Sequence, residues 1–267
     1  MIYKEGSKGS EVVKIQKKVG VSADGAFGPR TKEAVMQWQK AHGLDADGIV
    51  GDKTWSAMFG EAISTNSKCV DGCVYDPLSI HITRSPNRTI RYIAIHFTAG
   101  SNSKKGRARS TKHVFESRKA SADFCVDDME IVQFNPDLSN YYCWSVGDKK
   151  YGNKGGKLYG IAKNNNTISI EVCSTCTPAT TQAVSVDNHK GWSFTPQVLD
   201  NAVKLTKILM AKFNIPLDRV VRHYDISGKL CPGIYGWNDE PIKDISGKKT
   251  GEINNSNEWL KFKARLK

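Results

Sequence analysis

Two histidines and one cysteine of this sequence have side chains suited to hold a metal ion. His223 follows an apolar pair, Cys231 comes soon after it, and His96 ends the apolar run Tyr92–Ile95. Imidazole nitrogen and thiolate sulfur are good zinc ligands, and zinc in proteins takes about four donors in a tetrahedron. A His–His–Cys set leaves the fourth position to water, which is the pattern of catalytic zinc sites. The same residues could instead be core histidines and a buried free cysteine without a metal.

Two further residues could act on a substrate beside such a metal. Glu171 follows Thr167–Ile170, a stretch in which apolar residues alternate as they do in a strand. A carboxylate among apolar neighbours is a natural general base for a water that a metal activates, although it could instead be a salt-bridged residue at a rim. Lys229 stands two residues before Cys231. A lysine near a divalent cation can stabilise the negative oxygen that develops from a reacting carbonyl.

The elements that must position these residues are strands and helices in alternation. Arg91–Phe97 predicts a buried strand that carries His96, and Val220–His223 predicts a last, short strand. Residues 120–133 predict a hairpin. Thr195–Pro196 is typical of a helix start, because proline suits the first helical position. This alternation predicts an α/β domain with a mixed central sheet flanked by helices.

The N-terminal part of the chain contains an internal repeat. The pattern Ala-Asp-Gly-x-Phe-Gly-x-x-Thr-x-x-Ala over residues 23–34 recurs over residues 46–57, with Val in place of Phe. In each copy Asp-Gly predicts a turn before a helix start, because glycine adopts positive φ without steric cost. An amphipathic stretch between Ser10 and Gly20 adds one more helix. Together these segments predict a small three-helix bundle.

Four short motifs together resemble one enzyme family. Ile95–Thr98, Ile168–Glu171, Arg222–His223 and Lys229–Gly233 are similar to motifs of the type-2 zinc N-acetylmuramoyl-L-alanine amidases, which include phage endolysins, bacterial autolysins and peptidoglycan recognition proteins. The resemblance spans roughly residues 75–240. It implies the fold of that family and cleavage of the amide bond between N-acetylmuramic acid and L-alanine. It also implies site residues: Zn²⁺ on His96, His223 and Cys231, Glu171 as general base, and Lys229 as stabiliser of the oxyanion.

The sequence departs from many members of that family at Ala122–Asp123. Relatives carry a His or a Tyr-His there, and in some of them the tyrosine assists catalysis. Its absence shifts the role of base to Glu171, as in the members that use a glutamate, and leaves Asp123 without an assigned role. Two alternatives stay open: a non-catalytic peptidoglycan receptor of the same fold, and a host autolysin in place of a phage endolysin. The host and the type of stem peptide stay open as well.

Residues 4–60 resemble the peptidoglycan-binding type-1 domain, a three-helix module found beside wall hydrolases. The two Asp-Gly motifs carry this resemblance, which implies a wall anchor without catalysis. We therefore expect residues 1–62 to form a three-helix peptidoglycan-binding domain. Residues 63–74 are expected to be a linker, and residues 75–267 the zinc amidase catalytic domain.

The charge of the chain indicates the kind of partner. The 267 residues carry a net charge of +12 with a pI of about 9.3, which favours a polyanion. No nucleic-acid recognition motif accompanies the charge. The two family resemblances imply bacterial peptidoglycan as the partner, both as substrate and as anchor. The sequence begins without an apolar signal core and holds no apolar run of membrane-spanning length. We expect a monomer without membrane insertion, made in the cytoplasm and acting on the wall after holin-type release if a phage encodes it.

Seven cysteines are present. An odd number without a secretory signal argues against a disulfide framework. Cys69 with Cys73, and Cys173 with Cys176, form two pairs that are close in sequence. A second, structural zinc site, disulfides and free thiols all stay open for these four residues.

Overall fold

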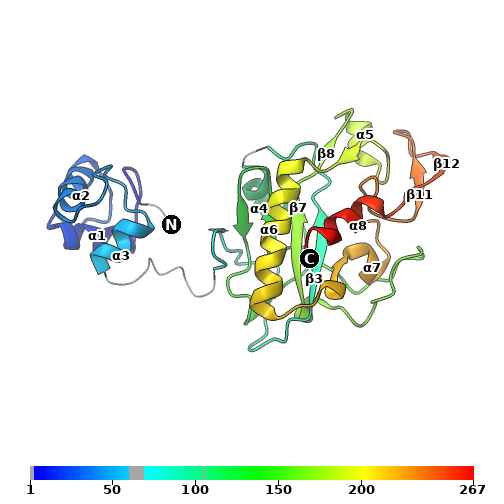
Figure 1. Ribbon diagram of the computed structural model, residues 1–267, viewed down its shortest axis with the longest axis horizontal. Helices are drawn as coiled ribbons and strands as arrows, with labels where there is room; N and C mark the ends of the chain where they lie inside the picture. Colours follow the sequence, from blue (N-terminus) through cyan, green and yellow to red (C-terminus); the bar gives the residue numbers. More distant parts are fainter. Residues whose placement is uncertain (1–2, 60–68, 105) are drawn as a thin grey trace. The chain divides into compact units, whose positions relative to one another are not determined.

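The structure, a computed structural model, describes residues 3–59, 69–104 and 106–267 of the chain. The chain divides into two units, residues 1–67 and 68–267 (Figure 1). Residues 63–68 of the expected linker lie outside the described residues. Residues 69–74 belong to the second unit, in whose core Val70 is buried. None of the helices in the described ranges has both the length and the apolar character that a membrane crossing requires.

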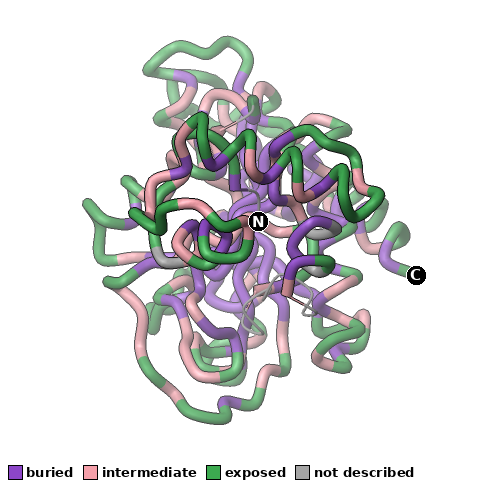
Figure 2. The backbone as a smooth tube through the Cα atoms, turned by 90° about the vertical axis from the view of Figure 1, so that its left-hand side faces the viewer, coloured by how far each residue is buried: buried purple, intermediate pink, exposed green. Residues whose placement is uncertain are grey.

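The first unit is a three-helix bundle, as the sequence predicted. Its helices are α1 (Ser10–Val19), α2 (Pro29–Ala41) and α3 (Asp52–Phe59). Buried and exposed residues alternate along these segments (Figure 2), so that each helix turns one side to a shared core. That core consists of apolar residues from the helices and the turns: Tyr3, Val12, Ile15, Phe27, Val35, Val50, Trp55 and Met58.

In each copy of the sequence repeat, a buried glutamine is hydrogen-bonded to the Asp-Gly turn. The Gln16 amide group donates to the Asp24 carboxylate at 2.7 Å and to the Ala26 carbonyl at 3.0 Å. Its oxygen accepts a hydrogen bond from the Gly25 N–H at 2.9 Å. In the second copy the same three bonds, each 2.9 Å long, join Gln39 to Asp47, Ile49 and Gly48. The repeat therefore extends back to these glutamines, which the Asp-Gly pattern did not indicate.

A mixed six-stranded sheet forms the centre of the second unit, again as predicted. Its strands lie in the order β1-β5-β4-β7-β3-β10. The central strand β3 (Tyr92–Phe97) is parallel to both β7 (Thr167–Val172) and β10 (Val220–Arg222). The predicted hairpin is present as the antiparallel strands β4 (Phe124–Val126) and β5 (Ile131–Gln133). The sheet thus places the strands of His96 and Glu171 side by side, with the strand before His223 on the other side of β3.

The two faces of this sheet have different neighbours. Ile93 and Ile95 belong to the main core, together with apolar residues of α6 (Pro196–Phe213), which packs across β7 and β3 (Figure 1). Successive strand residues point to opposite faces, so Ala94 and His96 point away from α6. Ala94 packs there in a smaller cluster with residues of the long loop before β7 and of α7. The candidate site therefore lies on the sheet face opposite α6.

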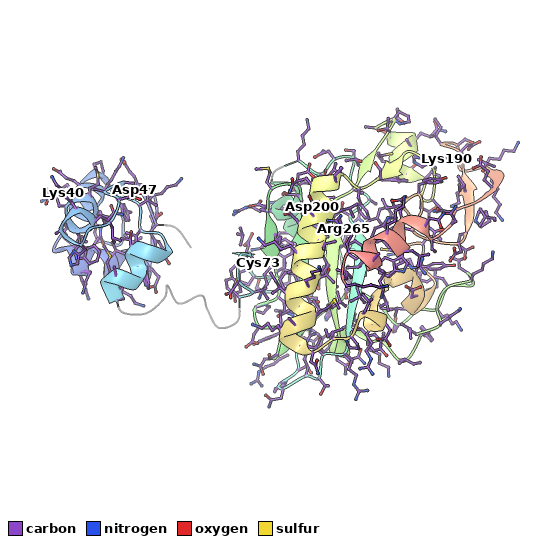
Figure 3. All side chains as sticks on the ribbon, viewed as in Figure 1. Lys40, Asp47, Cys73, Lys190, Asp200 and Arg265 are labelled. Atoms are coloured by element: carbon purple, nitrogen blue, oxygen red, sulfur yellow. The ribbon has the colours of Figure 1, made fainter. Side chains whose placement is uncertain are left out.

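Shorter elements surround the sheet, and the last of them ties the C-terminus to it. Helix α8 (Asn257–Ala264) places Trp259 and Phe262 against Trp237, with ring centroids 5.3 Å apart in both cases. Figure 3 shows Arg265 next to Asp200 of α6, and the two side chains form an ion pair of 2.5 Å. The remaining elements are β1 (Val74–Tyr75), β2 (Ile82–Arg84), α4 (Arg107–Ser117), β6 (Tyr141–Cys143), η1 (Asn164–Asn166), β8 (Thr175–Cys176), α5 (Thr181–Ser185), β9 (Trp192–Ser193), η2 (Leu217–Arg219), α7 (His223–Ser227), β11 (Pro241–Lys243) and β12 (Lys249–Ile253).

Candidate metal centre

Three neighbouring elements bring His96, His223 and Cys231 together. His96 lies near the end of β3, and His223 is the first residue of α7, directly after β10, which pairs with β3. Cys231 follows the turn at Gly228, whose φ of 81° suits glycine. The carbonyl of Cys231 accepts a hydrogen bond of 2.9 Å from the backbone N–H of Tyr224. The parallel pairing and this backbone bond together place the three side chains at one point.

The distances among the three side chains suit a shared metal ion. One donor atom from each lies within 4.8 Å of the others, and all three residues are buried. Sγ of Cys231 is 3.6 Å from Nδ1 of His96. Sulfur and nitrogen ligands of a tetrahedral zinc ion lie about 3.6 Å apart at the usual bond lengths. Within the described part of the chain, no other group of three or more His, Cys, Asp or Glu residues could hold a metal ion.

The hydrogen bonding of the histidines also fits metal ligation. Nε2 of His223 lies 3.1 Å from the carbonyl oxygen of Val146, so this nitrogen carries the proton and Nδ1 keeps its lone pair. Nδ1 of His223 and Nε2 of His96 are buried and have no hydrogen-bond partner among the described residues. An unpaired buried polar atom costs free energy, and a cation bound to Nδ1 of His223 would offset that cost.

Burial sets the protonation of the three side chains. It lowers the pKa of His223 to about 3, with the charge of Lys229 adding to the effect. It also lowers the pKa of His96 well below the usual value. Both imidazoles are therefore neutral near pH 7, as metal ligation requires. Burial raises the pKa of the Cys231 thiol to about 12, so ionisation of this thiol needs a nearby cation, which a bound metal provides.

Glu171 is the carboxylate beside this group. It is the register partner of His96 across β3 and β7, and its Oε1 lies 4.0 Å from Nδ1 of His96. Its Oε2 is buried and has no hydrogen-bond partner in the described ranges. Burial raises the pKa of Glu171 to about 8, an effect that the charge of Lys229 opposes. A carboxyl group with this pKa can accept and return a proton near neutral pH.

Lys229 is exposed after the turn that ends α7. After burial, its positive charge is a further cause of the low pKa of His223, and it opposes the raised pKa of Cys231. The side chain is thus close enough to act electrostatically on the candidate centre. Because it is exposed, a substrate at the centre can reach it.

Asp123, to which the sequence assigned no role, is a fully buried structural residue. Its Oδ1 accepts a hydrogen bond from the Asn135 amide at 2.5 Å, and its Oδ2 accepts one from the Ser169 hydroxyl at 2.8 Å. Arg88 lies 3.7 Å from the same carboxylate. Because both carboxylate oxygens accept hydrogen bonds inside the unit and the side chain is fully buried, Asp123 has a structural role and is not accessible to a substrate.

The other cysteines do not form a second metal site. All seven cysteines are free thiols. Cys173 contacts Cys125, with the sulfur atoms 3.8 Å apart, and Cys176 contacts Nε2 of His189 at 3.7 Å. Cys69 lies by Cys73, whose carbonyl it approaches at 3.8 Å. Of the possibilities that the sequence left open for these pairs, the free thiols are the one that the structure shows.

Two contacts that shape the centre were missed in the sequence. The Val146 carbonyl and the Tyr224 N–H are backbone groups, and any residue type supplies them. One signal was available in the adjacent Gly155 and Gly156, because a Cβ added to Gly155 would lie 2.3 Å from the carbonyl oxygen of Tyr224. Glycine is therefore required where the long loop touches α7.

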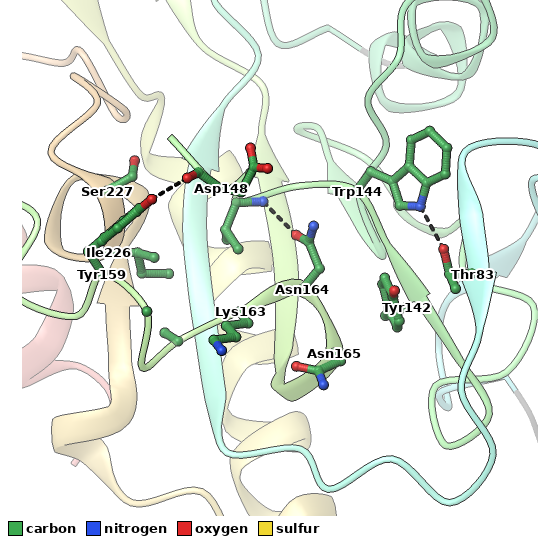
Figure 4. Close-up of a pocket in the computed structure, with 14 residues that line it drawn as sticks. Thr83, Tyr142, Trp144, Asp148, Tyr159, Lys163, Asn164, Asn165, Ile226 and Ser227 are labelled. Carbon is green, nitrogen blue, oxygen red and sulfur yellow. Dashed lines mark hydrogen bonds between the residues drawn. The ribbon is translucent and has the colours of Figure 1, made fainter. Parts of the chain in front are cut away.

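A cavity of about 840 Å³ lies on the same loop (Figure 4). Val146, whose carbonyl holds His223, lines it, whereas His96, His223, Cys231 and Glu171 do not. Its walls are fixed by hydrogen bonds: Trp144 donates to the Thr83 hydroxyl at 2.8 Å, and Asn164 accepts from the N–H of Val146 at 2.8 Å. The loop at Val146 therefore contacts His223 through its carbonyl and lines this cavity.

A buried His–His–Cys group with a carboxylate beside it, carried on an α/β sheet, is the arrangement expected of a metal-dependent hydrolase. The family model of the N-acetylmuramoyl-L-alanine amidases matches residues 86–234, more than half of the chain, and the chain belongs to this family. A model of a peptidoglycan binding domain matches residues 8–58. Both matches fall where the sequence motifs indicated them.

Two relatives of similar sequence are amidases of the same kind. N-acetylmuramoyl-L-alanine amidase CwlH of Bacillus subtilis (strain 168) is 33% identical over 144 residues, which are 53% of this chain and 46% of CwlH. The amidase XlyA of the same strain is 32% identical over 142 residues, 53% of this chain and 39% of XlyA. The chain thus matches less than half the length of these relatives. Among solved structures, the catalytic domain of XlyA has a TM-score of 0.45 at 26% identity, covering 73% of this chain and 99% of that domain.

Proposed function

We propose that this protein is a zinc-dependent N-acetylmuramoyl-L-alanine amidase that hydrolyses the amide bond between N-acetylmuramic acid and the L-alanine of the stem peptide. The observation that supports it most is the buried group of His96, His223 and Cys231 with Glu171 at 4.0 Å from His96. The substrate is inferred from membership of the amidase family.

His96, His223 and Cys231 would hold the zinc ion, which when bound acidifies a water molecule and polarises a carbonyl group. Val146 keeps His223 in the orientation that presents Nδ1. Glu171 takes one proton from the attacking water as its oxygen bonds to the carbonyl carbon. It then gives that proton to the amine nitrogen of L-alanine as the C–N bond breaks. Lys229 stabilises the negative charge that develops on the carbonyl oxygen.

Each of the two units has its own role in the proposed function. The second unit, residues 68–267, carries the hydrolysis, and residues 1–62 bind the wall as a module of the kind matched over residues 8–58. The protein acts as a monomer on cell-wall peptidoglycan, in the manner of a phage endolysin released from the cytoplasm. A host autolysin would perform the same chemistry. A receptor without activity is disfavoured, because the full set of zinc-ligand residues is present.

Mass spectrometry of digested cell wall tests the reaction. Hydrolysis by the full chain is expected to release stem peptides with a free L-alanine amine and to leave glycan strands intact. Release of shorter peptides or of disaccharides instead would show that another bond is cut. Wall binding without any released product would favour the receptor.

A further inference from the structure

Glu240 lies beyond the region that matches the amidase family, yet it contacts the element that carries His223. It is buried with 8% of its surface exposed, and it stands just before β11. Its Oε1 accepts a hydrogen bond of 2.7 Å from the Tyr224 hydroxyl and one of 2.8 Å from the Lys154 N–H. One carboxylate oxygen thus joins three segments: the C-terminal segment, α7 and the long loop before β7.

Tyr224 connects this carboxylate to both sides of the candidate centre. It follows His223 directly, and its N–H donates to the Cys231 carbonyl at 2.9 Å. Its own carbonyl accepts hydrogen bonds from Gly156 at 2.8 Å and from Gly228 at 2.9 Å. A shift of Tyr224 would therefore move His223 and Cys231 relative to His96, which is fixed in β3.

The C-terminal segment also contacts Arg222, the residue directly before His223. Arg222 is buried, and its Nη1 donates to the Trp237 carbonyl at 2.9 Å and to the Ser256 hydroxyl at 2.8 Å. Its guanidinium lies 5.5 Å from the ring of Trp259 in α8. Residues of the segment 237–259 therefore contact both sequence neighbours of His223, which are Arg222 and Tyr224. The family model does not cover this segment.

We propose that Glu240 is a positioning residue of the metal centre, which through Tyr224 and Lys154 locks α7 and the long loop and so sets the geometry of His223 and Cys231. This inference rests on the proposed function, because it takes these side chains to be metal ligands. Residues that orient metal ligands typically change metal affinity about 10- to 100-fold when they are altered. Replacement of Glu240 is expected to change zinc affinity by a factor in that range, although Glu240 contacts neither a metal ligand nor the substrate.

The test compares full-length variants by chelator competition for zinc and by the absorption spectrum of the cobalt-substituted protein. Glu240→Ala is expected to weaken zinc binding about 10- to 100-fold and to change the thiolate-to-cobalt band of Cys231. Glu240→Gln keeps an oxygen that accepts both hydrogen bonds, so zinc affinity close to that of the unaltered protein is expected. Tyr224→Phe removes one of the bonds without shortening Glu240 and should weaken zinc binding in the same direction. Glu252→Ala, an exposed glutamate in β12 of the same segment, is the matched control.

Hydrogen exchange without metal separates this inference from the proposed function. If Glu240 acts as proposed, the amides of Gly156 and Leu158, which bond to carbonyls of α7, exchange faster in Glu240→Ala or, should that variant not fold, in Tyr224→Phe. Unchanged exchange together with unchanged zinc affinity in both variants would overturn the positioning role. Failure of the unaltered chain to bind zinc would overturn the proposed function, and the exchange result would still decide whether Glu240 locks the loop.

Discussion

Glu171 and His96 face each other across two parallel strands, 75 residues apart in the chain, with Oε1 and Nδ1 separated by 4.0 Å. The sheet register fixes this pairing, since a slip by one residue would turn one of the two side chains to the face covered by α6. A carboxylate with a pKa of about 8 is thereby held beside a buried group of metal-ligand type. This relationship makes Glu171 the first residue to test.

Glu171→Gln is expected to lower kcat on purified peptidoglycan by about 100-fold or more, because a positioned general base contributes roughly 10²–10⁴-fold. The amide keeps the size of the side chain but cannot take a proton from water. Zinc content and wall binding should not change. Glu130→Gln, which alters a carboxylate paired with Arg109 away from the centre, serves as the control. Near-normal turnover by a folded, zinc-loaded Glu171→Gln protein would refute the role.

The same substitution should stabilise the metal-free protein at high pH. The pKa of Glu171 is about 8 when folded against 4.5 for the ordinary group, so the folded chain binds this proton more tightly than the unfolded chain does. The stability associated with Glu171 is fully present below pH 4.5 and is lost as the pH rises to 8. Glu171→Gln should therefore raise the melting temperature at pH 8 and change it little below pH 4.5.

Differential scanning calorimetry of the metal-free protein checks this pH dependence. Saturating zinc should shrink the gain, because a nearby cation stabilises the ionised carboxylate. The exposed Glu252→Gln serves as the reference substitution. An equal change in melting temperature at both ends of the pH range would show that the carboxyl group is not buried in the way described.

Lys229→Ala is expected to reduce kcat by about 10²–10³-fold, the usual cost of removing one oxyanion-stabilising group. The side chain is exposed, so the folded state should keep its melting temperature. Steady-state kinetics together with zinc analysis would show a fall in kcat at unchanged zinc content. Lys249→Ala, an exposed lysine of β12, provides the comparison, and equal kinetics of both variants would remove Lys229 from the mechanism.

Residue types and apolar periodicity were sufficient to predict the strands that carry His96 and Glu171, the hairpin of β4 and β5, and the three-helix unit. They were sufficient because each is a local pattern of side chains along one element. Thr195 likewise caps α6 as predicted, by accepting a hydrogen bond from the Val198 N–H. The order of strands in the sheet is not local. Ligand chemistry and the family resemblance grouped His223 with His96, but neither indicated that β10 lies beside β3.

The contacts that could not be predicted are those between backbone groups or between segments distant in the chain. His223 is oriented by the Val146 carbonyl, 77 residues away in sequence, and any residue at position 146 offers a carbonyl. Glu240 reads in the sequence as one acid among 27 Asp and Glu residues. Its burial against Tyr224 and Lys154 arises only when the C-terminal segment packs on the sheet.

Cys231→Ser should remove the metal. The thiolate is the one sulfur donor in the group, and a serine hydroxyl is a poor zinc ligand at neutral pH. Metal analysis of the purified protein should show about one zinc per chain and a large loss of it in Cys231→Ser. Cys143→Ser, which alters a buried cysteine outside the group, controls for the general effect of changing a thiol. Full zinc content and activity in Cys231→Ser would refute the ligand assignment.

The two units should bind the wall by different forces. Residues 1–67 carry nine Lys and Arg against eight Asp and Glu, whereas residues 68–267 carry 30 against 19. Attraction between exposed charges is screened by salt, so wall retention of residues 68–267 alone should fall steeply with ionic strength. Retention of residues 1–62 should depend on it much less. Co-sedimentation of each fragment with purified wall at low and high salt measures this, with an unrelated protein of matched charge as control. Residues 68–267 should also cleave solubilised peptidoglycan alone. No retention of residues 1–62 above the control at any salt concentration would exclude an anchoring role for the three-helix unit.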